Sequence, residues 1–142
     1  ERAAAQVISG GNLKGFAGVV PGVLEETYVA LRSGKPIYLV GAFGGAGRAV
    51  FDQMFGHGSA AFEDGHAEVP DMVQVRELFQ EHGGIPLDTV GMGEGFAESG
   101  KLGPEVALKN GLTDAENEVL FRSTDARRIA ELVLTGLTRI VD

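Results

Sequence analysis

The stretch that decides the fold is residues 36–54, which read PIYLVGAFGGAGRAVFDQM. Its uncharged apolar run over residues 37–40 is typical of a parallel strand covered on both faces. A glycine turn over residues 41–47 follows at once, and Val50 and Met54 then continue at helical spacing. Strand, glycine turn and helix in this order form the repeating unit of an α/β protein with a parallel sheet.

The same order occurs immediately upstream. An apolar stretch over residues 1–9 predicts a strand, which ends where Gly10 and Gly11 remove the side chains. A loop then leads to a helix that we expect to start at Pro21 and to end at Gly34. A right-handed crossover between the two strands would place both glycine turns at one edge of the sheet.

The middle of the chain gives weaker signals. We expect a loop over residues 56–69 and a helix over residues 70–82, in which apolar side chains follow one stripe. Residues 85–111 are interrupted by glycines and show no clear period, apart from a short helix expected over residues 103–108. This part of the chain therefore receives no functional assignment.

The C-terminal part of the chain predicts two helices. Thr113 and Glu116 form a capping box, so one helix begins near residue 114. Ser123 or Thr124 is expected to cap the last helix. The apolar face of that last helix consists of Ile129, Leu132, Val133, Leu137 and Ile140. Such a face either closes the core or supports a homodimer.

Length and composition indicate one domain. The 142 residues are 44% apolar, which is enough for one hydrophobic core and too little for two ordinary domains. We therefore predict a single α/β domain over residues 1–142, a Rossmann-like three-layer fold with a mostly parallel sheet. Because the chain enters a strand soon after Glu1, we expect the first strand or strands of this domain to lie upstream of residue 1.

Charge and residue usage exclude several classes of partner. The net charge is −8, and no run of lysine or arginine offers a surface for duplex nucleic acid. The sequence has no cysteine, which excludes disulfides and cysteine metal sites. No apolar run approaches the roughly 18 residues of a membrane span. We therefore expect a cytoplasmic protein with no membrane and no duplex nucleic acid as partner.

The two glycine turns are the strongest candidate for a binding site. Each leads into a helix, and helix N-terminal amides beside glycines form a ready site for an anion such as a pyrophosphate. The candidate ligand-binding residues are Gly10, Gly11, Lys14, Gly15, Pro21, Gly22, Glu25, Gly41, Gly44 and Gly45. The alternative is that these glycines only make tight turns between strands and helices.

The charged side chains near these turns have two interpretations each. Glu25 and Glu26 lie in the first turn of the helix after Pro21, where a carboxylate can accept hydrogen bonds from a ribose or act as a catalytic acid or base. Otherwise they only complement the helix dipole. Lys14 and Arg48 are either partners of a phosphate or ordinary surface residues.

Other chemistry has no support in the sequence. His57, His66 and His82 lack the spacing of a metal-binding helix, so we expect neither a metal nor a cofactor. Ser9 and Ser59 do not lie in a strand-to-helix nucleophile elbow with glycines on both sides. A hydrolase triad is therefore not expected.

These motifs resemble the SLOG superfamily. The resemblance rests on residues 8–11 (ISGG), Gly15, Phe16, Gly18, residues 21–26 (PGVLEE), residues 34–36 (GKP), Gly41, residues 43–46 (FGGA), residues 110–113 (NGLT), Glu116, Asn117, Leu120, Phe121 and residues 123–125 (STD). It extends over residues 5–55 and 108–137. SLOG domains are Rossmann-like and include the LOG phosphoribohydrolases that activate cytokinins, the sensor modules of TRPM channels and bacterial sensors of NAD-derived nucleotides.

The resemblance implies a nucleotide pocket. Its ligand would be ADP-ribose or a cyclic relative, held by Gly10, Gly11, Pro21, Gly22, Glu25, Gly41, Gly44 and Gly45. The LOG enzymes carry the motif P-G-G-x-G-T-x-x-E, whereas here Pro21 and Gly22 reach glutamate sooner and the G-T pair is missing. Our first hypothesis is therefore a sensor domain that binds an NAD-derived nucleotide and signals to a partner or a fused effector. The alternatives are a phosphoribohydrolase or other N-glycosidase using Glu25 or Glu26, and a structural domain for dimerisation.

Overall fold

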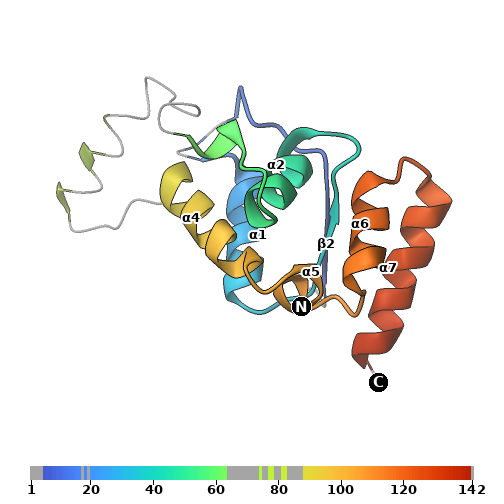
Figure 1. The fold of residues 1–142 in the computed structure, drawn as a ribbon. Helices are drawn as coiled ribbons and strands as arrows, with labels where there is room; N and C mark the ends of the chain where they lie inside the picture. The colour runs from blue at the N-terminus through green and yellow to red at the C-terminus, as the bar shows by residue number, and fades with distance from the viewer. Residues whose placement is uncertain are drawn as a thin grey trace.

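The fold is a mixed α/β arrangement around a pair of parallel strands (Figure 1). The computed structural model describes residues 5–16, 18, 20–63 and 88–141, together with positions 74, 77, 78, 81 and 82. The described elements are β1 (Gln6–Ser9), α1 (Gly22–Arg32), β2 (Ile37–Val40), α2 (Gly45–Met54), the 3-10 helix η1 (Ala60–Phe62), α4 (Thr89–Gly100), α5 (Pro104–Leu108), α6 (Asp114–Arg122) and α7 (Ala126–Val141). The helix expected over residues 70–82 lies largely outside the described residues.

The two strands are parallel neighbours connected through α1. Val7 is paired with Tyr38, and Ile8 is paired with Leu39. β2 is buried along its whole length, as its uncharged sequence predicts, whereas Val7 on β1 is 52% exposed. The predicted series of strand, helix, strand and helix is confirmed, with the strands parallel. The wider three-layer arrangement stays a prediction.

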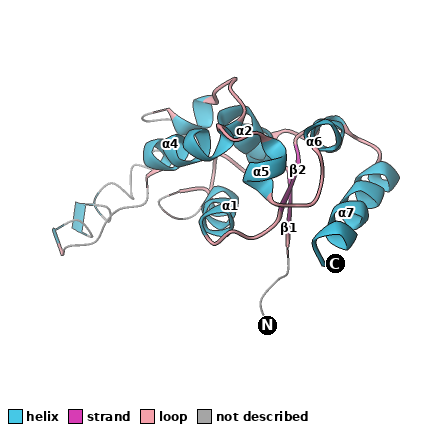
Figure 2. Ribbon diagram, turned by 60° about the horizontal axis from the view of Figure 1, so that its bottom comes forward, coloured by secondary structure: helices cyan, strands magenta, loops and turns pink. Residues whose placement is uncertain are grey.

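The two faces of β2 support separate hydrophobic clusters. Figure 2 shows α1, α2, α4 and α5 on one side of the strands and α6 and α7 on the other. On the first side, Leu39 packs in a cluster with Val50 of α2 and Phe96 of α4. On the second side, Tyr38 packs in a cluster with Leu120 of α6. The alternation of side chains along β2 therefore divides the core into two parts.

The predicted apolar face of α7 closes the second cluster. Leu132 is buried there, and Ile129, Val133 and Leu137 pack against it while partly exposed. Ile140, at the end of the helix, remains exposed. Most of this face therefore packs at least partly inside the chain.

Buried amide groups fix α6 against β2. Asn110 Nδ2 donates to the carbonyl oxygen of Ile37 and to Asn117 Oδ1, each at 2.8 Å. The hydroxyl of Tyr38 donates to the carbonyl oxygen of Asn110 at 2.8 Å, and burial raises the pKa of this hydroxyl. Both asparagines are buried, so each bond satisfies a polar group that would be costly to leave unpaired. These asparagines therefore have a structural role.

Helix α4 lies in the segment over residues 85–111, where no clear period was found in the sequence. Its glycines pack against neighbouring elements: a Cβ on Gly93 would come within 2.6 Å of the Phe62 Cβ. Gly100 lies against the backbone carbonyl of Met54 and leaves no room for a Cβ. A glycine inside a helix costs about 1 kcal/mol relative to alanine, and this close packing on α2 and η1 offsets the cost. The glycines interrupt the apolar periodicity of α4 in the sequence, and the same glycines allow the helix to pack closely against its neighbours.

The cap of α7 differs from the prediction. Asp125 Oδ1 accepts hydrogen bonds from the amides of Arg127 at 2.9 Å and Arg128 at 3.4 Å. Ser123 Oγ instead accepts from the amide of Asp125 at 3.2 Å, and Thr124 makes no cap among the described residues. A carboxylate at this position also interacts favourably with the helix dipole, which explains why it prevails over the neighbouring hydroxyls.

The starts of α1 and α6 are close to those predicted. Pro21 is the residue before α1 and Gly22 is the first helical residue, one position later than expected. The capping box of Thr113 and Glu116 is confirmed. Arg139 of α7 donates two hydrogen bonds to the Glu116 carboxylate, at 2.6 and 3.1 Å, and these bonds, together with that from the Thr113 amide, lower the pKa of Glu116 to about 2.

Candidate functional site

The two glycine turns meet at one edge of the strand pair. The amide of Gly47 donates to the carbonyl oxygen of Gly10 at 2.9 Å, and the amide of Ala46 donates to that of Gly11 at 3.1 Å. The start of α2 is therefore attached directly to the turn that follows β1. The predicted juxtaposition of the turns is confirmed.

The amides at the start of α2 are occupied by the protein itself. Besides Ala46 and Gly47, which bond to the first turn, Gly44 donates to the carbonyl oxygen of Gly41 at 2.9 Å. An amide that already donates to a carbonyl is not free to bind a phosphate. The expectation that both helices present free N-terminal amides is thus wrong for most of this helix end.

The start of α1 is different. The amides of Leu24 and Glu25 both donate to the carbonyl oxygen of Pro21, at 2.9 and 3.1 Å, and no side chain caps the helix. The preceding amides, those of Gly22 and Val23, have no acceptor among the described residues. Val23 also lies beside Gly11, within 3.2 Å of the position of a Cβ on that glycine. This helix end therefore adjoins the first turn with its leading amides available.

The glycines of the candidate site fall into two groups. They differ in whether a Cβ added at the glycine would overlap neighbouring atoms or enter open space. In the packed group, a Cβ on Gly41 would overlap the ring of Phe121, one on Gly45 would meet the backbone of Gly10 and Gly11, and one on Gly11 would lie 2.9 Å from the Ala46 Cβ. These glycines are required by contacts within the chain.

The open group has space next to the backbone. A Cβ on Gly10, Gly15, Gly22 or Gly44 would meet no described atom within 4 Å. Gly10 and Gly44 also have positive φ values, of 65° and 72°. A ligand can therefore approach the main chain closely at these positions.

Gly41 illustrates the packed group. Its amide donates to the carbonyl oxygen of Phe121 at 2.9 Å, so the end of β2 is bonded to the end of α6. The Phe121 ring stacks on Phe51, with ring centroids 3.7 Å apart. The need for glycine at position 41 therefore comes from the packing of α6.

The charged candidates have different surroundings. Arg48 pairs with Asp52 at 2.9 Å and lies over the ring of Phe121, 5.6 Å from its centroid, so its charge is already compensated. Lys14 is exposed in the loop after β1. Glu25 and Glu26 are both exposed, and their spacing places them on the same face of α1 as Gly22. Among the described residues, neither carboxylate forms a hydrogen bond or an ion pair with the glycine turns.

Phe43 is a candidate that the sequence reasoning did not assign. It stands in the turn between Gly41 and Gly44, and it is 57% exposed. Exposed large apolar residues elsewhere in the described chain are aliphatic, so this ring differs from them in kind. The signal in the sequence is a single aromatic residue inside a run of small residues.

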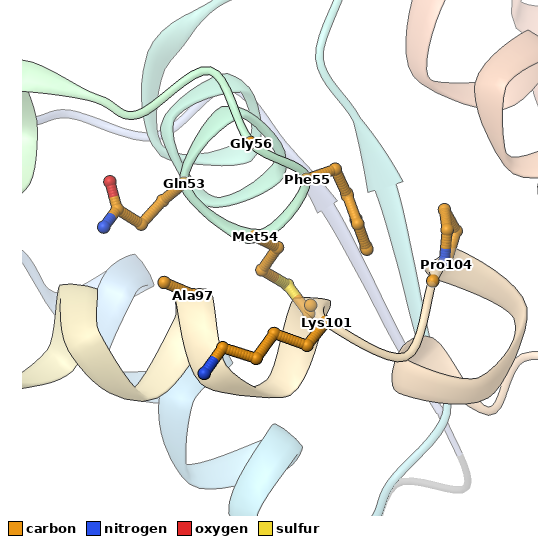
Figure 3. A pocket seen from close by; sticks show the side chains of 9 residues that line it. Gln53, Met54, Phe55, Gly56, Ala97, Lys101 and Pro104 are labelled. Atoms are coloured by element: carbon orange, nitrogen blue, oxygen red, sulfur yellow. The ribbon is translucent and has the colours of Figure 1, made fainter.

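A surface hollow of about 490 Å³ lies away from these turns (Figure 3). It forms at the opposite end of α2, between Met54 and Phe55 on one side and Ala97, Lys101 and Pro104 on the other. Its only charged side chain, Lys101, pairs with Glu98. The hollow therefore shares no residue with the predicted site.

The histidines, Ser59 and the helices were also considered for other functions. Among the described residues, no group of three or more potential ligands is arranged to hold a metal ion. His66 lies outside these residues. Ser59 caps η1 by accepting from the amide of Ala61 at 3.3 Å. Within the same residues, no helix is both long and apolar enough to cross a membrane.

The parallel strand pair and the glycine edge define a mixed α/β domain that is compatible with a Rossmann-like fold. The family model for SLOG cluster2 matches residues 1–120, and the chain belongs to this family. Neither the curated proteins nor the solved structures contain a significant match. Family membership therefore identifies a nucleotide-binding or related domain, and the SLOG resemblance of the motifs is confirmed.

Proposed function

We propose that this chain is a sensor or regulatory domain that binds an NAD-derived nucleotide such as ADP-ribose. The observation that carries the proposal is the group of open glycines, Gly10, Gly15, Gly22 and Gly44, which lie in the two glycine turns, the intervening loop and the first turn of α1. Glycines that face open space allow a ligand to reach the main chain, and family membership supplies the class of ligand.

The recognition of phosphate in this proposal rests on the first turn and α1. The amides of Gly22 and Val23 carry the positive end of the helix dipole, which favours a bound anion. Lys14 adds the one positive side chain of the intervening loop, residues 12–20. These local groups would attract a diphosphate even though the chain has a net charge of −8. The second turn would hold the first turn in place and not bind the phosphate itself, since the amides of Ala46 and Gly47 donate to the first turn.

The test is binding to a panel of ADP-ribose, cyclic ADP-ribose, NAD, AMP and ribose 5-phosphate, measured by calorimetry and thermal shift. A ligand at 100 times its dissociation constant stabilises a fold by about 2.7 kcal/mol, which such a shift detects easily. We expect at least one of the nucleotides to bind. If none binds, the proposal is wrong.

A matched pair of variants locates the site. Gly10→Ala places a methyl group in the open space at the strand edge, and we expect it to weaken binding by about tenfold or more, or about 1.4 kcal/mol. Gly58→Ala is the control, because Gly58 has φ of 67° against 65° for Gly10 and also has open space around it. The two glycines have nearly equal φ and both have open space, so a selective loss in Gly10→Ala reports the ligand. Equal affinities in both variants would move the site elsewhere.

The enzymatic alternative is a phosphoribohydrolase or other N-glycosidase. Its support is that Glu25 and Glu26 share the exposed face of α1 with Gly22. Incubation with AMP and ADP-ribose, followed by detection of the released base or sugar, tests it. Release that is lost in Glu25→Gln or Glu26→Gln would favour the enzyme, whereas binding without release favours the sensor.

A further inference from the structure

Phe43 is held on a rigid part of the strand edge. The amide of Gly44 donates to the carbonyl oxygen of Gly41 and closes the turn in which Phe43 stands. This turn is fixed on one side by the bond from the Gly41 amide to Phe121, and on the other by the attachment of α2 to the first turn. An aromatic ring whose backbone is already ordered loses little further freedom when a ligand covers it.

The exposure of this ring is unusual within the described chain. The other phenylalanines there, such as Phe51, Phe62, Phe96 and Phe121, are buried or partly buried, while Phe43 is 57% exposed. Burial of a phenylalanine side chain stabilises a fold, and the exposed part of this ring does not contribute to that stabilisation. The ring is therefore placed where it does not serve the core.

The residues beside Phe43 leave space for a flat partner. Gly44 follows it directly, and a Cβ there would meet no described atom within 4 Å. Gly10, whose carbonyl oxygen accepts from the amide of Gly47, has the same open surroundings. Because position 44 has no side chain, it does not obstruct a planar ring that approaches Phe43.

We infer that Phe43 is the platform on which the base of the ligand stacks. The inference rests on the proposed function and deepens it, because it requires the ligand to carry an aromatic base and not only a sugar phosphate. Stacking on an aromatic side chain holds any base by its flat face, whereas the glycines and amides recognise the phosphate. Phe43 thus makes the site selective for nucleotides over sugar phosphates that carry no base.

The experiment uses the absence of tryptophan from the sequence. In Phe43→Trp the introduced indole is the only one in the chain, and its fluorescence reports what stacks on it. The control is Leu102→Trp, since Leu102 is 68% exposed and lies between α4 and α5, beyond the opposite end of α2. Both variants are titrated with ADP-ribose and with ribose 5-phosphate. We expect ADP-ribose to quench the indole at position 43 and not the one at position 102, and ribose 5-phosphate to quench neither.

Affinity gives an independent measurement. Phe43→Ala is expected to weaken ADP-ribose binding by about tenfold, as the loss of one stacked base predicts, and to leave ribose 5-phosphate binding unchanged. Its melting temperature should stay close to that of the unsubstituted protein because the ring is exposed. Circular dichroism and thermal unfolding check that the variant is folded.

The outcomes separate this inference from the proposed function. If the unsubstituted protein binds no nucleotide, both are overturned. If ADP-ribose binds and Phe43→Ala binds it equally well, or if the indole at position 43 is not quenched, only the stacking role is overturned. A change in sedimentation of Phe43→Ala, with unchanged affinity for ADP-ribose, would show that the ring contacts a second copy of the chain instead.

Discussion

The two glycine turns look alike in sequence and differ in their surroundings. After β1, Gly10 faces open space, and Gly11 lies beside Val23 at the start of α1. After β2, Gly41 and Gly45 are pressed against Phe121 and against the backbone of the first turn. Gly11 in the first turn is also packed and Gly44 in the second is open, so the second turn is filled by the protein to a greater extent than the first.

This difference separates two reasons for a glycine. One is the approach of a ligand to the main chain, and the other is the approach of a neighbouring segment of the same protein. Loss of a ligand contact reduces affinity and leaves the fold intact, whereas loss of an internal contact reduces stability. Substitutions in the two groups should therefore have opposite signatures.

The largest effect is expected for Gly41→Ala. The added methyl would overlap the Phe121 ring, which is itself stacked on Phe51, so the ring and α6 would have to move. We expect a loss of about 3 kcal/mol in the free energy of unfolding, measured with urea. A double-mutant cycle with Phe121→Ala should show a coupling of about 1–3 kcal/mol, because the methyl has no ring to overlap there. A loss below about 1 kcal/mol would place Gly41 in the open group.

Adjacent residues allow a more direct comparison. Gly44 and Gly45 have similar φ values, of 72° and 62°. A Cβ on Gly44 would be unobstructed, whereas a Cβ on Gly45 would lie 2.7 Å from the carbonyl carbon of Gly10. Gly44→Ala should cost only the backbone strain, about 1–3 kcal/mol, and Gly45→Ala should cost at least about 1 kcal/mol more. Chemical unfolding of both variants measures the difference. Equal losses would mean that the turns are not in close contact.

A distant ion pair tests whether stability and binding are independent. Glu116 has a pKa lowered to about 2 from its usual 4.5, chiefly by hydrogen bonds from Arg139. A lowered carboxyl pKa stabilises the fold above pH 4.5, and this stabilisation is lost as the pH falls from 4.5 towards 2.

We expect Glu116→Gln to reduce stability at pH 7 by about 1 kcal/mol or less, since solvent screens a pair that is 27% and 46% exposed. The deficit should vanish near pH 2, as unfolding curves across this range will show. Nucleotide affinity at pH 7 should not change. A changed affinity would mean that the ion pair between α6 and α7 influences nucleotide binding at the strand edge.

The smallest effect on stability is expected for Gly22→Ala. Gly22 has helical backbone and open space, so alanine should change the free energy of unfolding by less than about 0.5 kcal/mol. The same methyl lies at the leading amides of α1, and we expect it to weaken nucleotide binding severalfold in calorimetry. Unchanged binding would remove α1 from the site.

The sequence predicted those features that depend on neighbouring residues. The apolar run of β2, the glycine turn after it and the capping box at Thr113 are local patterns, and all three are confirmed. The meeting of the two turns followed from the handedness of the crossover. Helix α4 was not predicted, because its glycines are typical of a loop when read locally. Gly93 packs against Phe62 and Gly100 packs against Met54, and both partners lie elsewhere in the sequence.

The division of the glycines was also beyond sequence reasoning. Whether position 41 faces a ligand or a side chain depends on Phe121, which is 80 residues away and whose packing no local pattern encodes. The exposure of Phe43 likewise follows from the turn geometry. The roles of Gly10, Gly15, Gly22, Gly44 and Lys14 in binding stay predictions.

The attachment of α2 to the first turn has a mechanical consequence. At its start this helix is bonded to Gly10 and Gly11, and at its end the carbonyl of Met54 lies against Gly100 of α4. The helix has 10 residues and acts as a strut about 15 Å long between the strand edge and the far side of the domain. A displacement of the first turn must therefore either break the two hydrogen bonds from Ala46 and Gly47 or move α2 as a whole. In the second case the end of α4 moves with it.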